Sequence, residues 1–374
     1  MSSPPNKNAK NRRVQRGDIP REPDSSVDLV RLLDIVASFP RQTICVIGDL
    51  VVDEFVSGEI SRVSREAPVL ILRHRHSEFY PGGGANAVNN IADLGARVLP
   101  VGVLGNDETG RRLRDVFRGK GISTSGIVEV PGLVTTRKTR FLAGWTHTTE
   151  QQVLRVDHEP NVPLPTKVAD AIVRNAQKFA RHAGAVLVSD YGLGVASPAL
   201  VRGLSAKEIT LDSRYRLLDY RNSGVSAATP NEPELEAAYH SHVGTDLRLL
   251  EQFSRRALQD LGLRALVVTR GKDGMAALER NPKNSSGKSG PIHHIPIFGS
   301  DTPVDVTGAG DTVIAVFTLA LGAGASYLEA AHLANYAAGI VVMKRRTASV
   351  TRAELESLLR REATLRHDRL DGHS

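Results

Sequence analysis

The sequence predicts an α/β fold in which a doubly wound, mostly parallel sheet carries helices on both faces and a small β-sheet lid. From residue 166 onward, strand-like and helix-like segments alternate along the chain, which is the order that builds parallel sheets. Residues 54–80 and 135–156 differ, because polar and apolar residues alternate loosely there, as in a half-exposed antiparallel sheet. The chain has 33 glycines and only 5% aromatic residues, which favours an α/β protein with a mostly aliphatic core.

The first elements follow a polar N-terminal segment. Residues 1–25 are rich in Asn, Arg, Pro and Ser and lack apolar periodicity, so we expect a disordered basic tail. A single domain is expected over residues 26–365, with a flexible tail at 366–374. Apolar spacing predicts a helix from about Val27, a strand at 43–47, a helix at 84–94, a strand at 98–103 and a helix at 107–117.

The second half continues the alternation. The predicted elements are a helix at 166–182, a strand at 185–189, a short helix with a strand at 209–211, a helix at 246–260 and a strand at 265–269. Residues 280–291 are rich in Gly, Pro and Asn, so we expect a flexible surface loop there. The predicted closing helices lie at 310–322, 327–343 and 352–363.

Composition excludes several classes of protein. Cys45 is the only cysteine and lies in an apolar run, which rules out an internal disulfide or a zinc site made of cysteines. No apolar stretch is long enough to cross a bilayer, and the polar N-terminus does not resemble a secretory signal, so we expect a cytoplasmic protein. The net charge is +7, but residues 1–25 contribute six cations and three anions, or +3 of it, which argues against a nucleic-acid partner.

The clearest chemical signal is Asp305-Val-Thr-Gly-Ala-Gly-Asp311, which leads into a predicted helix. A Gly-Ala-Gly turn at a helix N-terminus leaves backbone N–H groups free to bind an anion. Asp311 lies beside that anion hole, where a carboxylate can accept a proton from a hydroxyl that attacks phosphorus. The alternative is an ordinary helix start, because Asp is common at N-caps and Gly is common in turns.

Two further motifs follow strands or begin helices. Pro81-Gly-Gly-Gly-Ala-Asn86 allows a ligand to approach the backbone, and Asn86 offers a donor and an acceptor to a polyol; the alternative is a flexible hinge. Gly48-Asp-Leu-Val-Val-Asp53 places Asp49 and Asp53 after a strand, where ligands bind in open α/β sheets; the alternative for Asp49 is loop capping.

Polar segments at 229–234 and 269–274 each end or follow a strand, where they could hold a nucleotide and its magnesium. Two apparent motifs are rejected. Gly287-Lys288-Ser289 lacks the glycine that a P-loop requires five residues earlier, where this chain has Pro282. His293 and His294 are adjacent on a predicted strand and so face opposite ways, which favours a surface strand over a metal site.

Together, the motifs at 82–86 and 305–311 resemble the two signatures of the ribokinase-like PfkB carbohydrate kinases. The resemblance covers about residues 40–355. It implies a doubly wound α/β domain with a small β-sheet lid, which matches the patterns at 54–80 and 135–156. It also implies an ATP-dependent sugar kinase that uses Mg²⁺.

The resemblance gives each matching residue a role. Asp311 becomes the catalytic base, and its anion hole is formed by Gly308, Ala309 and Gly310. The implied nucleotide-binding residues are Asn231, Glu234, Thr269, Gly271, Gly274 and Asn335, with Glu234 binding magnesium through water. The candidate sugar-binding residues are Asp49, Asp53, Gly83, Gly84 and Asn86. Asp305 and Thr307 are candidates for binding a monovalent cation such as K⁺.

Within the family, residues 48–55, 61–69 and 189–191 resemble the heptose 7-phosphate kinases of lipopolysaccharide-precursor synthesis. That resemblance adds Asp190 as a substrate-binding candidate. It also makes cationic residues candidate contacts to a sugar phosphate, unless they are exposed lid charges: Arg62, Arg65, Lys138 and Arg140. The chain departs from the subgroup at Leu193, where a lysine is usual, and at Asp212-Ser-Arg214, where Asp-Pro-Lys is usual.

We therefore expect a kinase that phosphorylates position 1 of a heptose 7-phosphate. The His-x-Gly-His motif of the bifunctional relatives' nucleotidyltransferase does not occur, so kinase activity alone is predicted. The alternatives are a kinase for ribose, fructose or a fructose phosphate, and a non-catalytic sugar-binding regulator on the same fold. The intact Asp311 favours catalysis. We also expect a homodimer through the lid, because a second subunit would cover the exposed face and edge of that sheet.

Overall fold

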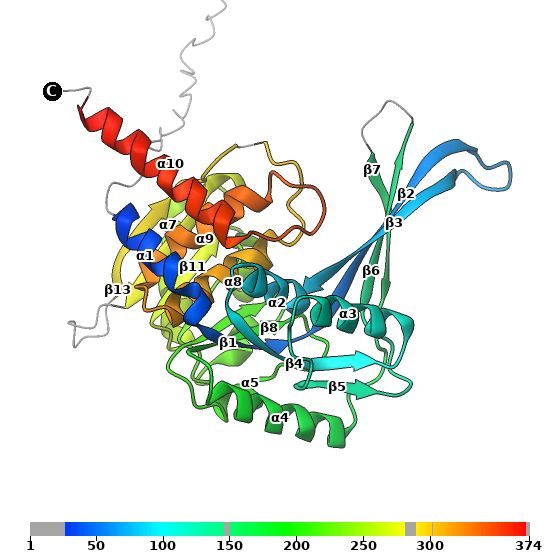
Figure 1. Ribbon diagram of the computed structural model, residues 1–374, viewed down its shortest axis with the longest axis horizontal. Coiled ribbons are helices and arrows are strands. Elements are labelled where there is room, and N and C mark those ends of the chain that lie inside the picture. The colour runs from blue at the N-terminus through cyan, green and yellow to red at the C-terminus, as the bar shows by residue number, and fades with distance from the viewer. Residues whose placement is uncertain (1–26, 146–149, 281–288, 301, 372–374) are drawn as a thin grey trace, which may run out of the picture.

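The computed structural model describes residues 27–145, 150–280, 289–300 and 302–371 (Figure 1). The expected disordered tail at 1–25 and residues 281–288 of the predicted loop lie outside these ranges. Within the described ranges, no helix is long and apolar enough to cross a membrane.

The described strands form a main sheet of nine strands, in the order β13-β12-β11-β10-β9-β8-β1-β4-β5. Neighbours from β11 to β5 are parallel, whereas β12 and β13 add an antiparallel edge. The strands are β1 Thr43–Gly48, β4 Arg97–Gly105, β5 Ile127–Val130, β8 Ala185–Asp190, β9 Ile209–Ser213, β10 Ala227–Ala228, β11 Ala265–Thr269, β12 Met275–Arg280 and β13 Ser289–Ile295. The predicted α/β class is confirmed.

Helices cover both faces of this sheet and bury two separate apolar cores. One face carries α1 Leu29–Ser38, α2 Gly84–Asp93, α3 Glu108–Gly119, α8 Ala309–Gly322, α9 Tyr327–Val341 and α10 Arg352–Asp371. The other carries α4 Thr166–Ala180, α5 Pro198–Arg202, α6 Glu232–Tyr239 and α7 Leu247–Asp260. Helix α8 is buried without interruption from Asp311 to Leu321, so it forms a rigid support for the residues at its N-terminus.

The predicted lid is present as a second sheet that stands off the main domain in Figure 1. It contains β2 Leu50–Val63, β3 Leu70–Gly83, β6 Arg137–Gly144 and β7 Gln151–His158, in the order β3-β2-β6-β7. The half-exposed antiparallel pattern expected from the sequence holds for β2–β3 and β6–β7, whereas β2 and β6 are parallel. Both strands enter the lid from the main domain, so they run in the same direction.

The elements that the sequence did not predict include β5, β10, β12 and α6. Strand β10 has two residues, and α6 begins in the polar segment Asn231-Glu-Pro-Glu234, which reads like a loop. Residues 280 and 289–291 of the predicted loop belong to β12 and β13, because they continue the antiparallel edge.

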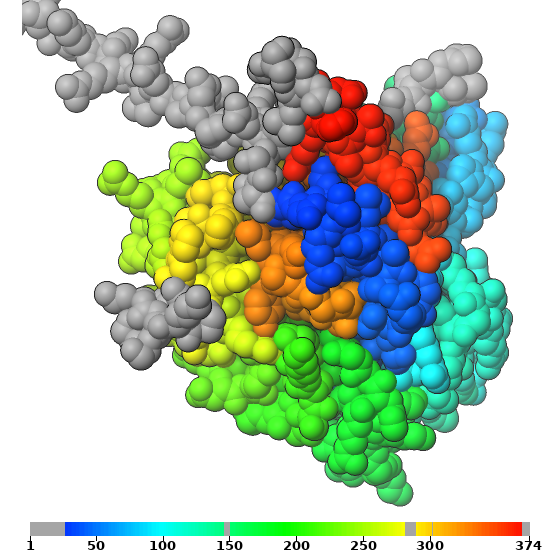
Figure 2. Space-filling view, turned by 60° about the vertical axis from the view of Figure 1, so that its left-hand side comes forward, coloured from blue at the N-terminus to red at the C-terminus, as the bar shows by residue number. Residues whose placement is uncertain are grey.

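Helix α10 continues past residue 363, and residues 366–371 of the expected flexible tail are helical. It lies over α1 and beside α9, as Figure 2 shows for the red and blue helices. The Arg366 guanidinium donates to the carbonyl of Val27 (3.3 Å) and to the hydroxyl of Tyr336 (3.4 Å). These contacts explain the extra turns, which apolar periodicity alone did not indicate.

Candidate active site

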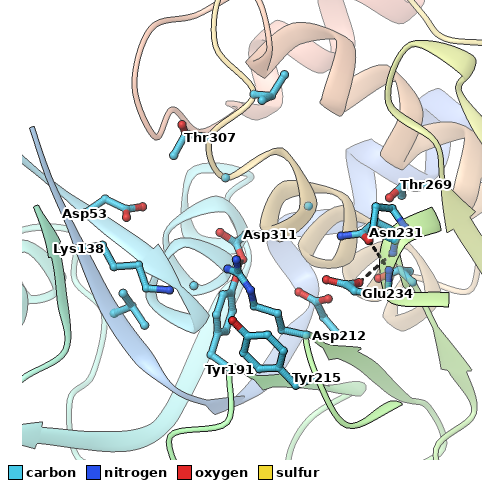
Figure 3. Close-up of a pocket in the computed structure, with 18 of the residues that line it drawn as sticks. Asp53, Lys138, Tyr191, Asp212, Tyr215, Asn231, Glu234, Thr269, Thr307 and Asp311 are labelled. Atoms are coloured by element: carbon cyan, nitrogen blue, oxygen red, sulfur yellow. Dashed lines mark hydrogen bonds between the residues drawn. The ribbon is translucent and has the colours of Figure 1, made fainter. Parts of the chain in front are cut away.

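A cavity of about 560 Å³ lies between the lid and the carboxyl ends of the central strands. This edge, next to the β1–β8 pair where the strand order reverses, is where ligands bind in open α/β sheets. Figure 3 shows lid residues on one side of the cavity and residues of β9, β11, α6 and α8 on the other. The lining side chains that carry charge are Asp53, Lys138, Arg140, Arg155, Asp212, Arg214, Glu234 and Asp311.

Asp311 lies in the first turn of α8, but it is not the helix cap. The N-cap is Gly308, whose φ of 79° lies in the left-handed region that favours glycine. The side chain of Asp311 instead bonds to two side chains from distant segments, Tyr191 and Asn86. The ordinary-cap alternative therefore does not describe this residue.

Each carboxylate oxygen of Asp311 accepts one hydrogen bond. The Tyr191 hydroxyl donates to Oδ1 (2.7 Å), and the Asn86 amide donates to Oδ2 (3.0 Å). Burial, followed by the negative charge of Asp212, raises the pKa of Asp311 to about 7, although both donors act to lower it. A carboxyl group with a pKa near neutrality is suited to general base catalysis at physiological pH.

Asn86 is committed to this arrangement. Its Nδ2 donates to Asp311 and to the carbonyl of Gly308 (3.2 Å), and its Oδ1 accepts from Asn90 (3.0 Å). A Cβ at Gly308 would lie 2.5 Å from the Asn86 nitrogen, so the glycine is needed for the contact. The structure therefore places Asn86 behind the base and outside the cavity lining, and the sugar contact that the sequence predicted stays a prediction.

The predicted nucleotide-binding pair caps a helix. The Asn231 side chain accepts from the Glu234 N–H (2.8 Å), and the Glu234 carboxylate accepts from the Asn231 N–H (2.9 Å), which is a reciprocal capping box for α6. Both residues also line the cavity, as does Thr269 at the end of β11. The two functions are compatible, because the cap fixes the side chains at the cavity wall.

Other predicted nucleotide-binding residues shape nearby backbone. Gly271 and Gly274 have φ of 55° and 77°, and a Cβ at Gly274 would lie 2.1 Å from the Ile295 carbonyl. Asn335 donates from α9 to the carbonyl of Pro296 (2.9 Å). None of the three is among the residues that line the described cavity.

Asp212 and Glu234 are acids without a described cationic partner in hydrogen-bond contact. Burial raises the pKa of both carboxyl groups, and their mutual charge repulsion raises that of Asp212 further. Carboxylate oxygens are the ligands that Mg²⁺ prefers, usually together with water and substrate phosphates. The pair fits a magnesium–nucleotide complex, because a divalent cation would relieve this repulsion. Among the described residues, no ready-made cluster of three metal-binding side chains occurs.

The basic side chains in and beside the lid lie in two kinds of environment. Arg140 donates to Asp53 Oδ1 (2.5 Å), whose Oδ2 accepts from the Thr347 hydroxyl (3.0 Å). Arg346 contacts Glu78 (2.8 Å) and Glu150 (3.2 Å) and so ties the loop after α9 to the lid. Lys138 has no such ion pair in the described chain, and burial, followed by the charges of Arg214 and Arg155, lowers its pKa.

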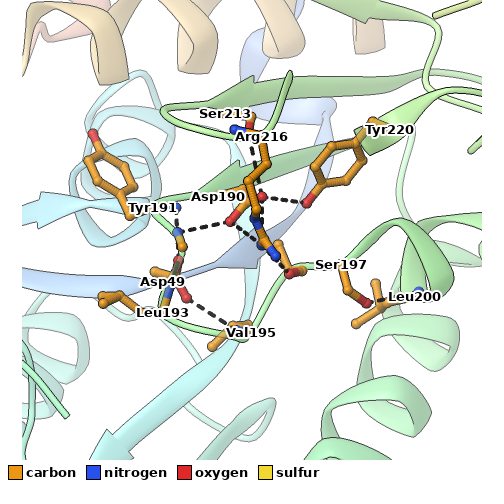
Figure 4. Close-up of polar contacts among 12 residues, drawn as sticks. Asp49, Asp190, Tyr191, Leu193, Val195, Ser197, Leu200, Ser213, Arg216 and Tyr220 are labelled. Atoms are coloured by element: carbon orange, nitrogen blue, oxygen red, sulfur yellow. Dashed lines mark hydrogen bonds and ion pairs between the residues drawn. The ribbon is translucent and has the colours of Figure 1, made fainter. Parts of the chain in front are cut away.

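Several predicted substrate residues lie outside the cavity. Arg65 is exposed at the tip of the lid, as is the neighbouring Arg62. Asp49 and Asp190 are buried behind the segment 191–195, where Figure 4 shows their polar contacts. The two aspartates already accept hydrogen bonds from backbone N–H groups, and Asp190 also accepts from Arg216, so neither faces the cavity as the sequence predicted. A substrate contact by Arg62 or Arg65 stays a prediction.

The glycines of the 81–86 motif divide between cavity and core. Gly83 lines the cavity with φ of 53°, whereas a Cβ at Gly84 would lie 2.9 Å from the carbonyl of Asp49. Gly308 and Gly310 line the cavity too, but Ala309 donates its N–H to Val306 (3.2 Å). In the 81–86 motif, the glycines therefore allow neighbouring backbone to pack closely, and the segment is not a hinge.

Asp305 joins two loops. Its Oδ1 accepts from the Thr307 N–H and its Oδ2 from the Arg346 N–H, each at 2.9 Å. Thr307 lines the cavity. The carboxylate therefore holds the turn before α8 against the loop after α9.

Sequence reasoning missed the cavity roles of five residues: Arg155, Tyr191, Asp212, Arg214 and Tyr215. Asp212 and Arg214 follow a predicted strand, so the rule that placed Asp49 and Asp53 at a ligand site applied to them as well. Arg155 gave no comparable signal, because its position depends on how the lid strands pair.

Comparisons with known proteins agree with this geometry. A family model described as pfkB family carbohydrate kinase matches residues 41–353. The relative named "Bifunctional protein HldE" from Desulfatibacillum aliphaticivorans is 37% identical over 333 residues, covering 87% of this chain and 64% of that protein. The protein of the same name from Geobacter metallireducens is 38% identical over 315 residues, covering 83% of this chain and 61% of its own. The chain thus spans about three fifths of the length of these relatives.

Solved structures show the same fold at low sequence identity. Arabidopsis thaliana ribokinase complexed with ribose and ATP has a TM-score of 0.64 and 19% identity, covering 85% of this chain and 98% of that one. Escherichia coli phosphofructokinase-2 in complex with substrates and products has a TM-score of 0.67 and 15% identity, with the same coverage of 85% and 98%. The ribokinase-like fold predicted from the sequence is confirmed.

Proposed function

This chain belongs to the pfkB family of carbohydrate kinases, and we propose that it transfers the γ-phosphate of ATP to position 1 of a heptose 7-phosphate, giving heptose 1,7-bisphosphate. The observation that carries the proposal is Asp311, a buried carboxyl with a pKa of about 7, at the N-terminus of a helix inside the cavity. The choice of sugar rests on the resemblance of residues 48–55, 61–69 and 189–191 to heptose 7-phosphate kinases, and on the similarity to proteins named HldE.

In the proposed reaction, Asp311 accepts the proton of the attacking hydroxyl as the new oxygen–phosphorus bond forms. The bond from the γ-phosphorus to the bridging oxygen breaks, and ADP leaves with that electron pair. The N–H groups of Gly310 and Asp311 belong to the first turn of α8 and have no acceptor within the helix. They and the helix dipole would stabilise the charge on the transferring group.

Asp212 and Glu234 would hold the magnesium of the nucleotide, partly through water. The metal, when bound, would neutralise charge on the phosphates. We assign two further segments to the nucleotide side of the site. One is the pair of glycine turns at 271 and 274, which follows Thr269. The other is the loop after β13, whose Pro296 carbonyl accepts a hydrogen bond from Asn335 of α9. The use of K⁺ at Asp305 and Thr307 stays a prediction, as does a cytoplasmic location.

The acceptor's own phosphate would bind the basic side of the cavity. Lys138, Arg155 and Arg214 line it and lie near enough for the two arginines to lower the pKa of the lysine. Among the described residues, Lys138 and Arg214 have no carboxylate in hydrogen-bond contact, whereas Arg140 is held by Asp53 and Arg155 by Asp157. Two cations that face a cavity without a paired anion favour a phosphorylated substrate.

We also propose a homodimer through the lid. The exposed apolar side chains of the lid include Val63, Val69, Leu70, Trp145, Val153, Leu154 and Val156. A second copy that covers them would remove this surface from water. Light scattering at micromolar concentration should give a dimer, and a monomer would contradict this part of the proposal.

The decisive assay measures ADP release by the purified protein with Mg·ATP and a panel of acceptors: heptose 7-phosphate, ribose, fructose and fructose 6-phosphate. We expect the highest kcat/KM for heptose 7-phosphate, with a product that carries a second phosphate in ³¹P NMR. Preferred turnover of another sugar would replace the substrate while retaining the kinase. Absence of turnover with every acceptor would favour a non-catalytic sugar-binding protein.

A further inference from the structure

The carboxylate of Asp311 is oriented by two neutral donors from two different segments. The Tyr191 hydroxyl, at the end of β8, donates to Oδ1 (2.7 Å), and Asn86, in α2, donates to Oδ2 (3.0 Å). No guanidinium or ammonium group makes a hydrogen bond to either oxygen among the described residues. The two donors therefore decide the plane of the carboxyl group and which lone pairs remain for a substrate hydroxyl.

We propose that Tyr191 is a positioning residue, whose phenol donates to Asp311 and so holds the carboxylate in its reactive orientation and favours its ionised form. This inference rests on the proposed function, in which Asp311 is the base. It assigns Tyr191 a role in catalysis without contact to the transferred group.

The backbone on which Tyr191 sits is fixed by two buried aspartates. Asp49 accepts from the N–H groups of Tyr191 (2.8 Å), Leu193 (3.1 Å) and Val195 (3.3 Å). Asp190 accepts from the Gly192 N–H (2.9 Å) and also from the side chains of Arg216 and Tyr220. Figure 4 shows this arrangement. Four anchored N–H groups in five residues make the segment 191–195 a rigid mount for the phenol.

The phenol ring is also confined from the lid side. Lys138 Nζ lies 5.2 Å from the ring centroid, which is a favourable cation–π distance. A Cβ at Gly83 would lie 3.1 Å from the ring, so this glycine gives the ring its space. Burial, then the charge of Asp311, raises the pKa of Tyr191 well above its ordinary value, so the phenol remains a donor.

The other groups around Asp311 act against its ionised form. Asp212 on β9 and Asp53 on β2 raise its pKa by charge repulsion, in addition to burial. Glu234 on α6 interacts with it unfavourably as well. Only Tyr191 and Asn86 lower its pKa among these neighbours, so loss of the phenol should shift the carboxyl toward its protonated form.

The test is the variant Tyr191→Phe, which keeps the ring and removes the donor. With Mg·ATP and heptose 7-phosphate, we expect the acid limb of the kcat profile to move about one pH unit higher, since a hydrogen bond to a charged group has at least that strength. The kcat at pH 6 should fall about tenfold, recover toward wild type by pH 9, and be accompanied by little change in KM for either substrate.

A second readout needs no substrate. Infrared difference titration follows the protonated carboxyl band of Asp311, identified by its loss in Asp311→Asn. Its midpoint should rise by about one unit in Tyr191→Phe. A shifted midpoint in a protein that does not phosphorylate heptose 7-phosphate would support the positioning role and reject the proposed substrate. An unshifted midpoint and an unshifted acid limb in an active enzyme would overturn the positioning role alone.

The matched control is Tyr220→Phe. Tyr220 is a fully buried phenol that donates to a neighbouring aspartate, Asp190 (2.8 Å), on the far side of the same segment. The Tyr220→Phe variant should have lower thermal stability, but the acid limb of its kcat profile and the titration midpoint of its Asp311 band should not move. If Tyr191→Phe proves too unstable to assay, the substitute is Asp49→Asn, which weakens the hydrogen bonds that hold the segment 191–195. It should move the acid limb of the kcat profile to higher pH as well, but by less. An equal shift in Tyr220→Phe would mean that any lost buried phenol has this effect, and would contradict the proposal.

Discussion

Two groups of acids lie at the same edge of the sheet, and they differ in their partners. Asp49 and Asp190 form a closed group behind the segment 191–195. Asp190 accepts from Arg216 (2.8 Å), Tyr220 (2.8 Å) and a backbone N–H, and Asp49 accepts from three backbone N–H groups. Asp212, Glu234 and Asp311 form an open group that lines the cavity. The hydrogen bonds that the open group accepts come only from neutral donors, and burial raises the pKa of all three carboxyl groups. Burial also raises the pKa of Asp49, to about 6, so the two groups differ in their partners and in their access to the cavity.

The difference shows what makes an acid available for chemistry in this fold. A carboxylate whose oxygens are filled by a guanidinium and by backbone N–H groups is a structural anchor. A carboxylate that lines the cavity among other acids is held in a state of higher energy, which a proton or a divalent cation that enters the cavity can relieve. The closed group fixes the backbone of the segment 191–195, and the open group supplies the reactive carboxylates of the cavity.

The largest expected effect tests the open group. Asp311→Asn keeps the size of the side chain but removes the proton acceptor, so kcat should fall by about 10²–10⁴ while ATP binding changes little. Asp246 is the control, because it does cap a helix, α7, through the N–H groups of Arg248 (2.8 Å) and Leu249 (3.3 Å). Asp246→Asn should leave kcat unchanged, since Asn is an equally good cap. Near-native turnover by Asp311→Asn would falsify its assignment as the base.

The next effect tests the closed group by stability. Asp190→Ala removes a buried carboxylate, leaves Tyr220 and the Gly192 N–H without their acceptor, and leaves Arg216 with only the Ala196 carbonyl. We expect the free energy of unfolding to fall by about 3 kcal/mol in urea denaturation. Asp157→Ala, which breaks a lid ion pair with Arg155 at 2.6 Å, should cost less than about 1 kcal/mol. Equal losses would mean that the closed group is no more structural than a surface pair.

A third prediction concerns the basic side of the cavity. Lys138→Ala and Arg214→Ala should each raise KM for a phosphorylated acceptor by about tenfold to a hundredfold, the range for one charge-assisted hydrogen bond. Arg65→Ala, at the exposed tip of the lid, is the control and should leave KM unchanged. Steady-state kinetics at saturating ATP measures both. If only Arg65→Ala changes KM, the acceptor phosphate binds elsewhere.

The sequence predicted the architecture well because the elements that build it have strong periodic signals. The lid pattern at 54–80 and 135–156, the apolar helix after Asp311 and the strand from Ala265 all depend on local residues. The parallel β2–β6 pair was missed, because strand direction depends on where the chain leaves the main domain.

The site was predicted less completely for a related reason. Asp49, Asp190 and Asp212 each follow a strand and look alike in the sequence, yet only Asp212 reaches the cavity. What separates them is the neighbour that each meets in space, such as Arg216 for Asp190. Tyr191 likewise contacts Asp311 across 120 positions of sequence, which no local motif encodes.

The last prediction compares the two groups through the pH dependence of stability. Burial raises the folded-state pKa of Asp311 from 3.8 to about 7, so between these values the folded protein holds a proton that the unfolded chain releases. Because the folded state then binds more protons, this residue makes the free energy of unfolding fall as pH rises through that window.

Asp311→Asn removes that titration. Relative to wild type, the variant should therefore become more stable as pH rises from 4 to 8, by up to about 4 kcal/mol for a pKa shift of about three units. An Asn amide cannot accept from Asn86 on the nitrogen that replaces Oδ2, but this loss is the same at every pH, so it lowers the whole profile without changing its slope. Urea denaturation of both proteins at pH 4, 6 and 8 measures the difference. Parallel pH profiles for the two proteins would show that Asp311 is as well satisfied as Asp190, and the distinction between the open and closed groups would then fail at its central residue.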